Sequence, residues 1–285
     1  MIQTAWASTE RKVERNKSLT ILHTNDTHSN IDPFPMNHAR FPGQGGVARR
    51  YDLIQRIKTE EENVLLLDSG DIFQGTPYFN KYHGVLEMKL MSELGYDAST
   101  MGNHDFDIGL EGFLNAKKYA NFPFLCANYD FSDTILKDQT LKHFVLDRAG
   151  IQIGIFGLGV ELKGLVSDSN YGKTRYLDPI ETANSQAELL RSKGCELIIC
   201  LSHLGFEYSD NKVSDKLLAS KTRGIHLILG GHTHTFLDRP LEVLNTDGEI
   251  VLINQVGFAG VNIGRLDYCL MNKRVIRHQV LQVKG

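Results

Sequence analysis

The chain has 285 residues, enough to bury a large hydrophobic core, and an α/β fold of this size often forms one domain. Its net charge of −3 excludes the basic excess of a nucleic-acid-binding protein, and no apolar run approaches the roughly 18 residues that span a membrane. The four cysteines form no CxxC pair, so we expect buried free thiols and no structural zinc site.

The first half of the chain alternates short apolar runs with segments of helical periodicity. Short apolar runs predict buried strands, and apolar residues spaced three or four apart predict one face of a helix. In chain order these patterns predict a strand at Leu19–Thr24, a helix with Val47, Tyr51, Ile54 and Ile57 on one face, a strand at Val64–Leu67, a helix marked by Leu86, Leu90 and Leu94, a strand at Ala98–Met101 and a helix at Glu111–Tyr119.

The second half contains more strands and one helix with a clear start. Asp178 as N-cap, Pro179 at the first helical position and Glu181 at the third predict a helix that begins there. The predicted strands are Phe122–Ala127, Phe144–Leu146, Ile151–Phe156, Leu197–Leu201 and His226–Leu229, followed by two late strands that look antiparallel, Ile250–Asn254 and Val261–Tyr268. Strands that alternate with helices indicate a layered α/β fold.

The N-terminal segment contains Ala5-Trp6-Ala7, an A-x-A pattern before a polar stretch. This pattern resembles the end of a secretory signal whose basic and apolar parts are missing, and the alternative is a short disordered tail with chance alanines. We therefore treat residues 1–18 as an N-terminal tail, with a signal-peptide remnant as one interpretation.

Polar side chains follow five of the predicted strands at the point where each strand ends. The carboxyl ends of the strands in an open α/β sheet form one crevice, where ligands bind. The five strands therefore deliver carboxylates, an amide and imidazoles to one edge, from Asp26 and His28, Asp71, Asn103, His203, and the pair His232 and His234 in the stretch GGHTH.

This set of side chains suits metal ions. Imidazole and carboxylate together favour transition metals such as zinc, manganese, iron or cobalt over calcium, which prefers oxygen ligands. Seven ligands are too many for one such ion and suit two ions that share a bridging carboxylate. Each motif alone fits an ordinary turn or strand end, and their occurrence at five strand ends favours the metal site. His23 is interpreted as a packed core histidine, and the rest outside the motifs, His38, His83, His143, His226 and His278, as structural or surface residues.

Five motifs together resemble a known family. HTNDTHS (His23 to Ser29), GDIFQGTPY (Gly70 to Tyr78), GNHDFDIG (Gly102 to Gly109), SHLG (Ser202 to Gly205) and GGHTH (Gly230 to His234) are similar to those of the calcineurin-like metallophosphoesterases. Within that superfamily they resemble the catalytic domain of the 5′-nucleotidases over roughly residues 19–270. The protein-phosphatase branch usually has GDxxDR, whereas GDIFQG stands here, which favours the nucleotidase branch.

The resemblance implies a four-layered α/β/β/α sandwich with a dinuclear metal site at the sheet edge. It assigns Asp71 as the bridge and His104 and Asp107 as the catalytic pair. It assigns Asp26, His28 and His234 to one divalent ion, and Asn103, His203 and His232 to the other.

The implied activity is 5′-nucleotidase-like hydrolysis of phosphomonoesters, such as nucleoside 5′-monophosphates, by a hydroxide that bridges the two ions. His104 would stabilise charge on the phosphoryl group or protonate the leaving oxygen, and Asp107 would fix its tautomer. Two alternatives stay open: a phosphodiesterase acting on cyclic nucleotides or similar diesters, and a non-catalytic metal-binding scaffold, which the intact ligand set disfavours.

Full-length 5′-nucleotidases carry a C-terminal domain that stacks the nucleobase and supplies arginines to the phosphate. This chain ends at Gly285, about where the catalytic domain would end. We therefore expect residues 19–285 to form the catalytic domain, with the nucleoside site absent or supplied by a separately encoded chain. Because family members are often exported, a periplasmic or cell-surface location is favoured over the cytoplasm.

Overall fold

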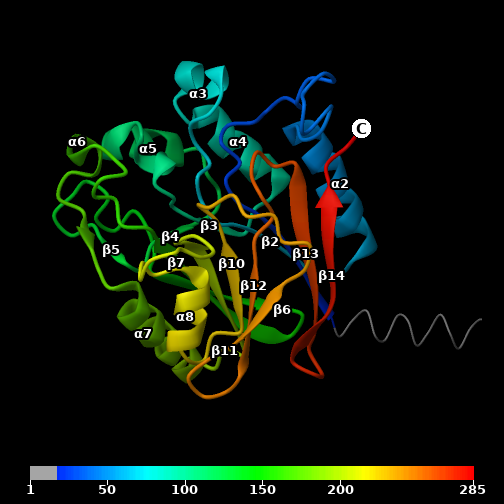
Figure 1. The fold of residues 1–285 in the computed structure, drawn as a ribbon, viewed down its shortest axis with the longest axis vertical. Coiled ribbons are helices and arrows are strands. Elements are labelled where there is room, and N and C mark those ends of the chain that lie inside the picture. The colour runs from blue at the N-terminus through cyan, green and yellow to red at the C-terminus, as the bar shows by residue number, and fades with distance from the viewer. Residues whose placement is uncertain (1–17) are drawn as a thin grey trace, which may run out of the picture.

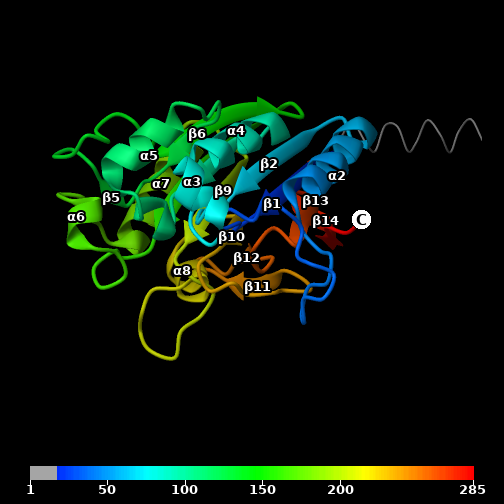
Figure 2. The same cartoon turned by 90° about the horizontal axis from the view of Figure 1, so that it is seen from above.

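The computed structural model describes residues 18–285, so Ala5-Trp6-Ala7 lies outside the described residues. At its centre is a six-stranded sheet in which β1 to β4 are parallel and the last two strands of the chain are antiparallel. In spatial order this first sheet consists of β14 (Arg274–Gln282), β13 (Asn262–Cys269), β1 (Ser18–Thr24), β2 (Val64–Asp68), β3 (Ala98–Thr100) and β4 (Phe124–Leu125). Figure 1 shows β13 and β14, in orange and red, side by side, and Figure 2 shows β1, in blue, near these strands from the other end of the chain.

A second six-stranded sheet packs against the first. Its four inner strands are parallel, and its two edge strands, β11 and β6, are antiparallel to their neighbours. In spatial order it consists of β11 (Leu241–Leu244), β12 (Ile250–Asn254), β10 (Leu227–Gly230), β9 (Leu197–His203), β7 (Ile151–Gly159) and β6 (His143–Arg148). A small separate sheet pairs β5 (Tyr129–Asp130) with β8 (Arg175–Tyr176).

Helices cover the outer face of each sheet, which confirms the expected α/β/β/α order of layers (Figure 2). The first sheet is covered by α2 (Val47–Glu60), α3 (Pro77–Tyr82), α4 (Val85–Leu94) and α5 (Gly109–Lys117), and the second by α7 (Pro179–Ser192) and α8 (Asp215–Lys221). Two short elements complete the chain, the 3-10 turn η1 (His104–Phe106) and α6 (Asp168–Tyr171). Within residues 18–285, no helix combines the length and the apolar character needed to cross a membrane.

The central strands carry apolar side chains on both of their faces because both faces are buried. In β1, Leu19 and Ile21 face the second sheet, whereas Leu22 packs under the helices. In β9, Ile199 lies between the sheets and Ile198 packs against the outer helices. These short runs between polar residues are therefore the reason that the sequence predicts the strands so directly.

The predicted start of α7 is confirmed. The Asp178 carboxylate accepts hydrogen bonds from the backbone N–H groups of Ile180 at 2.9 Å and Glu181 at 2.8 Å. Two of the amides that a helix start leaves without an intrahelical partner are thereby satisfied. The cysteines are all free, as expected, although Cys269 is only partly buried.

Two predictions about the elements are wrong in detail. In α2, Tyr51 is 44% exposed and Arg50 takes the buried position, where its guanidinium donates to the Asn30 carbonyl. Of the two late strands, β13 is antiparallel to β1 as predicted, whereas β12 is antiparallel to β11 but parallel to β10. Hydrophobic spacing misses both features, since it registers neither a buried arginine nor the partner of a strand.

Candidate metal centre

The side chains predicted to bind metal meet at the carboxyl ends of the parallel strands, in two groups. In each group the ligand atoms lie within 4.8 Å of one another; the groups are Asp26, His28 and His234, and Asp71, His203 and His232. They come from the loops after β1 and β2 in the first sheet and from the ends of β9 and β10 in the second. The sequence predicts that these ligands lie at the edge of one sheet. In the structure they lie at an edge to which both sheets contribute strands.

Asp71 belongs to the second group and also lies near the first. Its Oδ2 atom is 3.8 Å from Nε2 of His28 in one group and 3.1 Å from Nε2 of His203 in the other. Both the carboxylate and the His203 imidazole are buried. This placement is what a carboxylate shared by two cations requires, and it supports the predicted bridge.

Two histidines in the site have a fixed orientation. Nδ1 of His28 is 3.1 Å from the Phe73 carbonyl oxygen, and Nδ1 of His203 is 2.6 Å from the Ser69 carbonyl oxygen. A carbonyl only accepts, so each Nδ1 carries the proton and donates it, which leaves the lone pair of a neutral ring on Nε2. Backbone contacts of this kind orient metal-binding histidines.

Oδ1 of Asn103 is buried, makes no hydrogen bond within residues 18–285 and fits a metal ligand role. Buried polar atoms are normally hydrogen-bonded, so this oxygen needs another partner. Next to Asn103, Gly102 leaves room for the cluster, because a Cβ there would come within 2.6 Å of His203 Nε2. The donors present therefore fit two divalent transition-metal ions.

Most of the predicted metal ligands have a left-handed backbone conformation. Five of the seven have positive φ, namely Asp26 at 50°, His28 at 46°, Asp71 at 55°, His232 at 74° and His234 at 52°. Non-glycine residues rarely adopt this conformation, and such strain concentrates at functional sites. The sharp turns allow His232 and His234, two positions apart, to join different groups.

The predicted catalytic pair lies at the side of the two groups. Nδ1 of His104 is 2.8 Å from Oδ2 of Asp107, and the backbone N–H of His104 donates to Oδ1 of Asp71 at 2.8 Å. The His104 ring packs edge-on against His28. Its side chain is 37% exposed, unlike most of the predicted ligands, so a molecule in solution can reach it.

Residues 19–236 match the calcineurin-like phosphoesterase family. The chain belongs to this family. It is 34% identical to a snake venom 5′-nucleotidase of Crotalus adamanteus over 275 residues, 90% of this chain and 46% of that protein. It is 33% identical to the trifunctional nucleotide phosphoesterase of Bacillus subtilis over 293 residues, 91% of this chain and 18% of that protein.

A solved structure of similar fold is the 5′-nucleotidase precursor of Thermus thermophilus. The TM-score is 0.84 at 34% identity, and the match covers 93% of this chain and 54% of that one. The chain thus spans about half the length, or less, of the curated relatives it matches.

One residue that organises the site in this phosphoesterase was not singled out by the sequence patterns. The Asp105 carboxylate accepts four backbone hydrogen bonds, from Gly102, Asp71, Ile72 and Phe73, at 2.8 to 3.3 Å. It joins the loop of the predicted bridge to the loop of Asn103. The acidic residue inside GNHDFD was the available signal, but one aspartate between His104 and Phe106 has no spacing that distinguishes its role.

The electrostatics of the centre are dominated by buried carboxylates. Burial opposes a charge on His203, but Asp71 and Asp26 outweigh it and raise the pKa of His203 to about 10. Burial would raise the pKa of Asp71, yet the His203 charge holds that pKa well below its usual range. Burial, together with His203, lowers the pKa of His232 to about 4. The hydrogen bond to Asp107 raises the pKa of His104.

The other histidines stay outside both groups, as the sequence predicts. His23 is fully buried, and its Nε2 atom is 2.8 Å from Nδ2 of Asn254. Nδ1 of His226 accepts a hydrogen bond from the backbone of Ile198, and Nδ1 of His38 accepts one from the backbone of Phe41.

Proposed function

We propose that this phosphoesterase chain hydrolyses phosphomonoesters such as nucleoside 5′-monophosphates at the dinuclear centre. Two divalent transition-metal ions would be held there, one by Asp26, His28 and His234, the other by Asn103, His203 and His232, and Asp71 would contribute to both. The observation that carries the proposal is the position of Asp71 Oδ2 between His28 and His203, beside a partly exposed His104–Asp107 pair. The relatives named 5′-nucleotidase support the choice of substrate.

The chain's own residues have separate tasks in this reaction. When bound, two such cations activate a water molecule and neutralise phosphate charge. His104 presents Nε2 toward the substrate, where it donates a proton to the leaving oxygen or a hydrogen bond to a phosphoryl oxygen. Asp107 accepts from Nδ1 at 2.8 Å and so fixes the ring in the orientation that this requires.

The described residues offer little to hold a nucleobase. Phe258 lies beside the centre, but its ring stacks on His234 at 4.8 Å and packs against Phe41 and Phe236. Binding energy from the nucleoside would then contribute little to catalysis. We therefore propose that a further domain or a separately encoded chain supplies the nucleoside contacts.

A steady-state comparison of three substrates tests the function. With manganese or zinc present, the 285 residues should hydrolyse p-nitrophenyl phosphate, act more weakly on adenosine 5′-monophosphate, and lose both activities in a chelator. Adding the segment of the Thermus thermophilus relative that this chain does not cover should raise nucleotide turnover far more than aryl phosphate turnover.

Three results would contradict this proposal. Faster hydrolysis of bis(p-nitrophenyl) phosphate than of the monoester would favour the diesterase. Full activity in a chelator, with no metal by elemental analysis, would exclude the metal mechanism. A strong preference of the 285 residues alone for the nucleotide would show that they carry their own nucleoside site.

We also propose that the protein is exported. The relatives include a snake venom protein and a structure described as a precursor, and residues 5–7 match a signal cleavage pattern. Fractionation of the source cells should place the protein outside the cytoplasm. Recovery with a cytoplasmic marker enzyme would refute this location.

A further inference from the structure

A second cavity lies between the two sheets at the end of the molecule opposite the metal centre. It has a volume of about 490 Å³, within the range of small-molecule sites. Leu197 and Leu227, which line it, are the first residues of β9 and β10, whereas the candidate ligands lie at the other ends of these strands. Six residues of β9 at about 3.3 Å each separate this distal cavity from the centre by about 20 Å.

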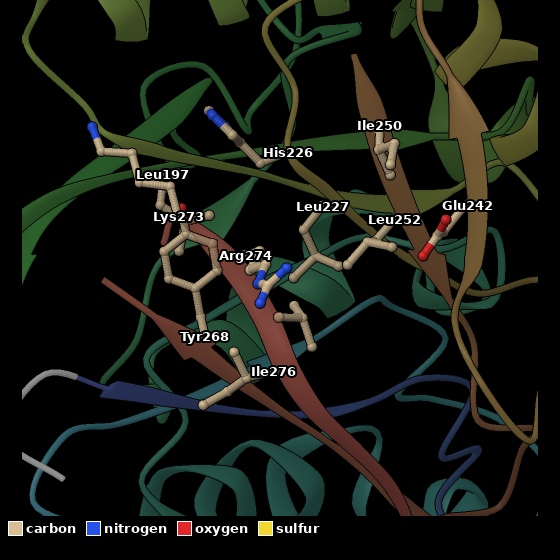
Figure 3. A pocket seen from close by; sticks show the side chains of 11 residues that line it. Leu197, His226, Leu227, Glu242, Ile250, Leu252, Tyr268, Lys273, Arg274 and Ile276 are labelled. Carbon is tan, nitrogen blue, oxygen red and sulfur yellow. The ribbon is translucent and has the colours of Figure 1, made fainter. Parts of the chain in front are cut away.

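One polar group that lines the distal cavity is a buried tyrosine hydroxyl. Tyr268 on β13 is only 4% exposed, yet its hydroxyl makes no hydrogen bond within the described residues. A buried hydroxyl without a partner is costly, and native proteins normally satisfy such groups. In Figure 3 the Tyr268 ring lies among the other lining side chains, which come from both sheets.

Besides Lys273, whose Nζ lies 3.0 Å from the Glu196 carboxylate, two further donors line the same space. The backbone N–H of Ile198 donates to Nδ1 of His226 at 3.0 Å, and burial lowers the pKa of His226. The neutral ring therefore carries its proton on Nε2, which remains free to donate. Arg274, at the start of β14, has a guanidinium that forms no ion pair or hydrogen bond within residues 18–285.

The walls and the mouth of the distal cavity are apolar. Leu227 and Leu252 form part of the wall, while Ile250 and Ile276, at the mouth, are 54% and 56% exposed. One carboxylate, that of Glu242, also lines the cavity, and Figure 3 shows it away from His226 and Tyr268. The cavity thus offers hydrogen-bond donors and a positive charge from His226, Tyr268 and Arg274, and the remainder of its lining, apart from Lys273 and Glu242, offers hydrocarbon.

We propose that the distal cavity binds a small amphipathic organic anion. Its acidic group pairs with the Arg274 guanidinium and accepts hydrogen bonds from the Tyr268 hydroxyl and His226 Nε2. Its apolar body lies against Leu227 and Leu252 and covers the isoleucines at the mouth. The site is separate from the phosphoesterase centre, so ligand binding is measured without reference to catalysis.

Isothermal titration with octane-1-sulfonate, an anion that phosphoesterases do not hydrolyse, tests the proposal. One molecule should bind per chain, and 1-octanol and octyltrimethylammonium should bind far more weakly. Arg274→Gln should weaken binding about tenfold or more, because it removes a charged hydrogen-bond partner. Tyr268→Phe should weaken binding several-fold while leaving the fold intact, since the hydroxyl has no partner to lose among residues 18–285.

Two matched variants sharpen the test. Glu242→Gln should keep or improve the affinity, because it removes a negative charge from the cavity wall. Arg56→Gln, an exposed arginine on α2, should change nothing. The proposal is overturned if binding does not saturate at millimolar concentrations, or if Arg274→Gln and Tyr268→Phe both leave the affinity unchanged. Equal binding of octanol, or weaker binding in Glu242→Gln alone, would also overturn it.

Discussion

Asp71→Asn is expected to abolish phosphoester hydrolysis and to reduce the metal content of the purified protein. The bridging position requires a carboxylate with charge toward both ions, and an amide offers a neutral oxygen and an N–H group that repels cations. If the variant loses several kcal/mol of the transition-state stabilisation that the metal ions supply, kcat/KM should fall by at least about 10³-fold. Turnover of p-nitrophenyl phosphate and elemental analysis measure the two effects.

Two aspartates serve as controls for this variant. Asp26→Asn should lower activity less, because Asp26 is assigned to one ion only. Asp52→Asn, exposed on α2, should behave as the unmodified protein. If Asp71→Asn retains two metal equivalents and most of the activity, Asp71 is not the bridge.

His104→Ala should lower kcat by about 10² to 10⁴-fold while two metal ions stay bound, because a positioned acid or base contributes that range. The His104 ring contacts His28 but belongs to neither group of candidate ligands. Asp107→Asn should give a smaller loss, since the amide oxygen can still accept from the ring and only the negative charge of the acceptor is lost. Loss of a metal equivalent in His104→Ala would show that His104 is a ligand.

The leaving group separates the two roles proposed for His104. If it protonates the leaving oxygen, the His104→Ala defect should be large for an alkyl phosphate and small for p-nitrophenyl phosphate, whose leaving group needs no proton. If it stabilises the phosphoryl oxygens, the two defects should be similar. Equal activity of the variant and the parent on both substrates would remove His104 from the mechanism.

The sequence predicts the buried strands better than the exposed elements. Strands such as β1 and β9 are short apolar runs because both faces are covered. The edge strands β11 and β14 carry polar residues on solvent-facing positions, so they leave no continuous run. The helices α3 and α8 have six and seven residues, too few for a helical period to emerge.

In the candidate site, too, some residues could be predicted from the sequence and others could not. The residues at the strand ends could be predicted because a motif follows each strand directly. The supports behind them could not, since they act over long separations in the chain. Asp105 binds the backbone of the Asp71 loop, and the Ser29 hydroxyl donates to Glu87 on α4. Bonds of this type leave no periodicity and no spacing in the sequence.

The shared edge of the two sheets has a consequence for the lifetime of the folded chain. One candidate ligand group joins Asp26 and His28 from the first sheet to His234 from the second. Bound ions would therefore cross-link the two halves of the sandwich, and separating the sheets would require breaking coordination bonds. A ligand that binds only the folded state raises the free energy of unfolding by about 4 kcal/mol when its concentration is a thousandfold above its Kd. The supply of divalent cations would thus govern how long the molecule survives heat and proteases, as well as how fast it turns over substrate.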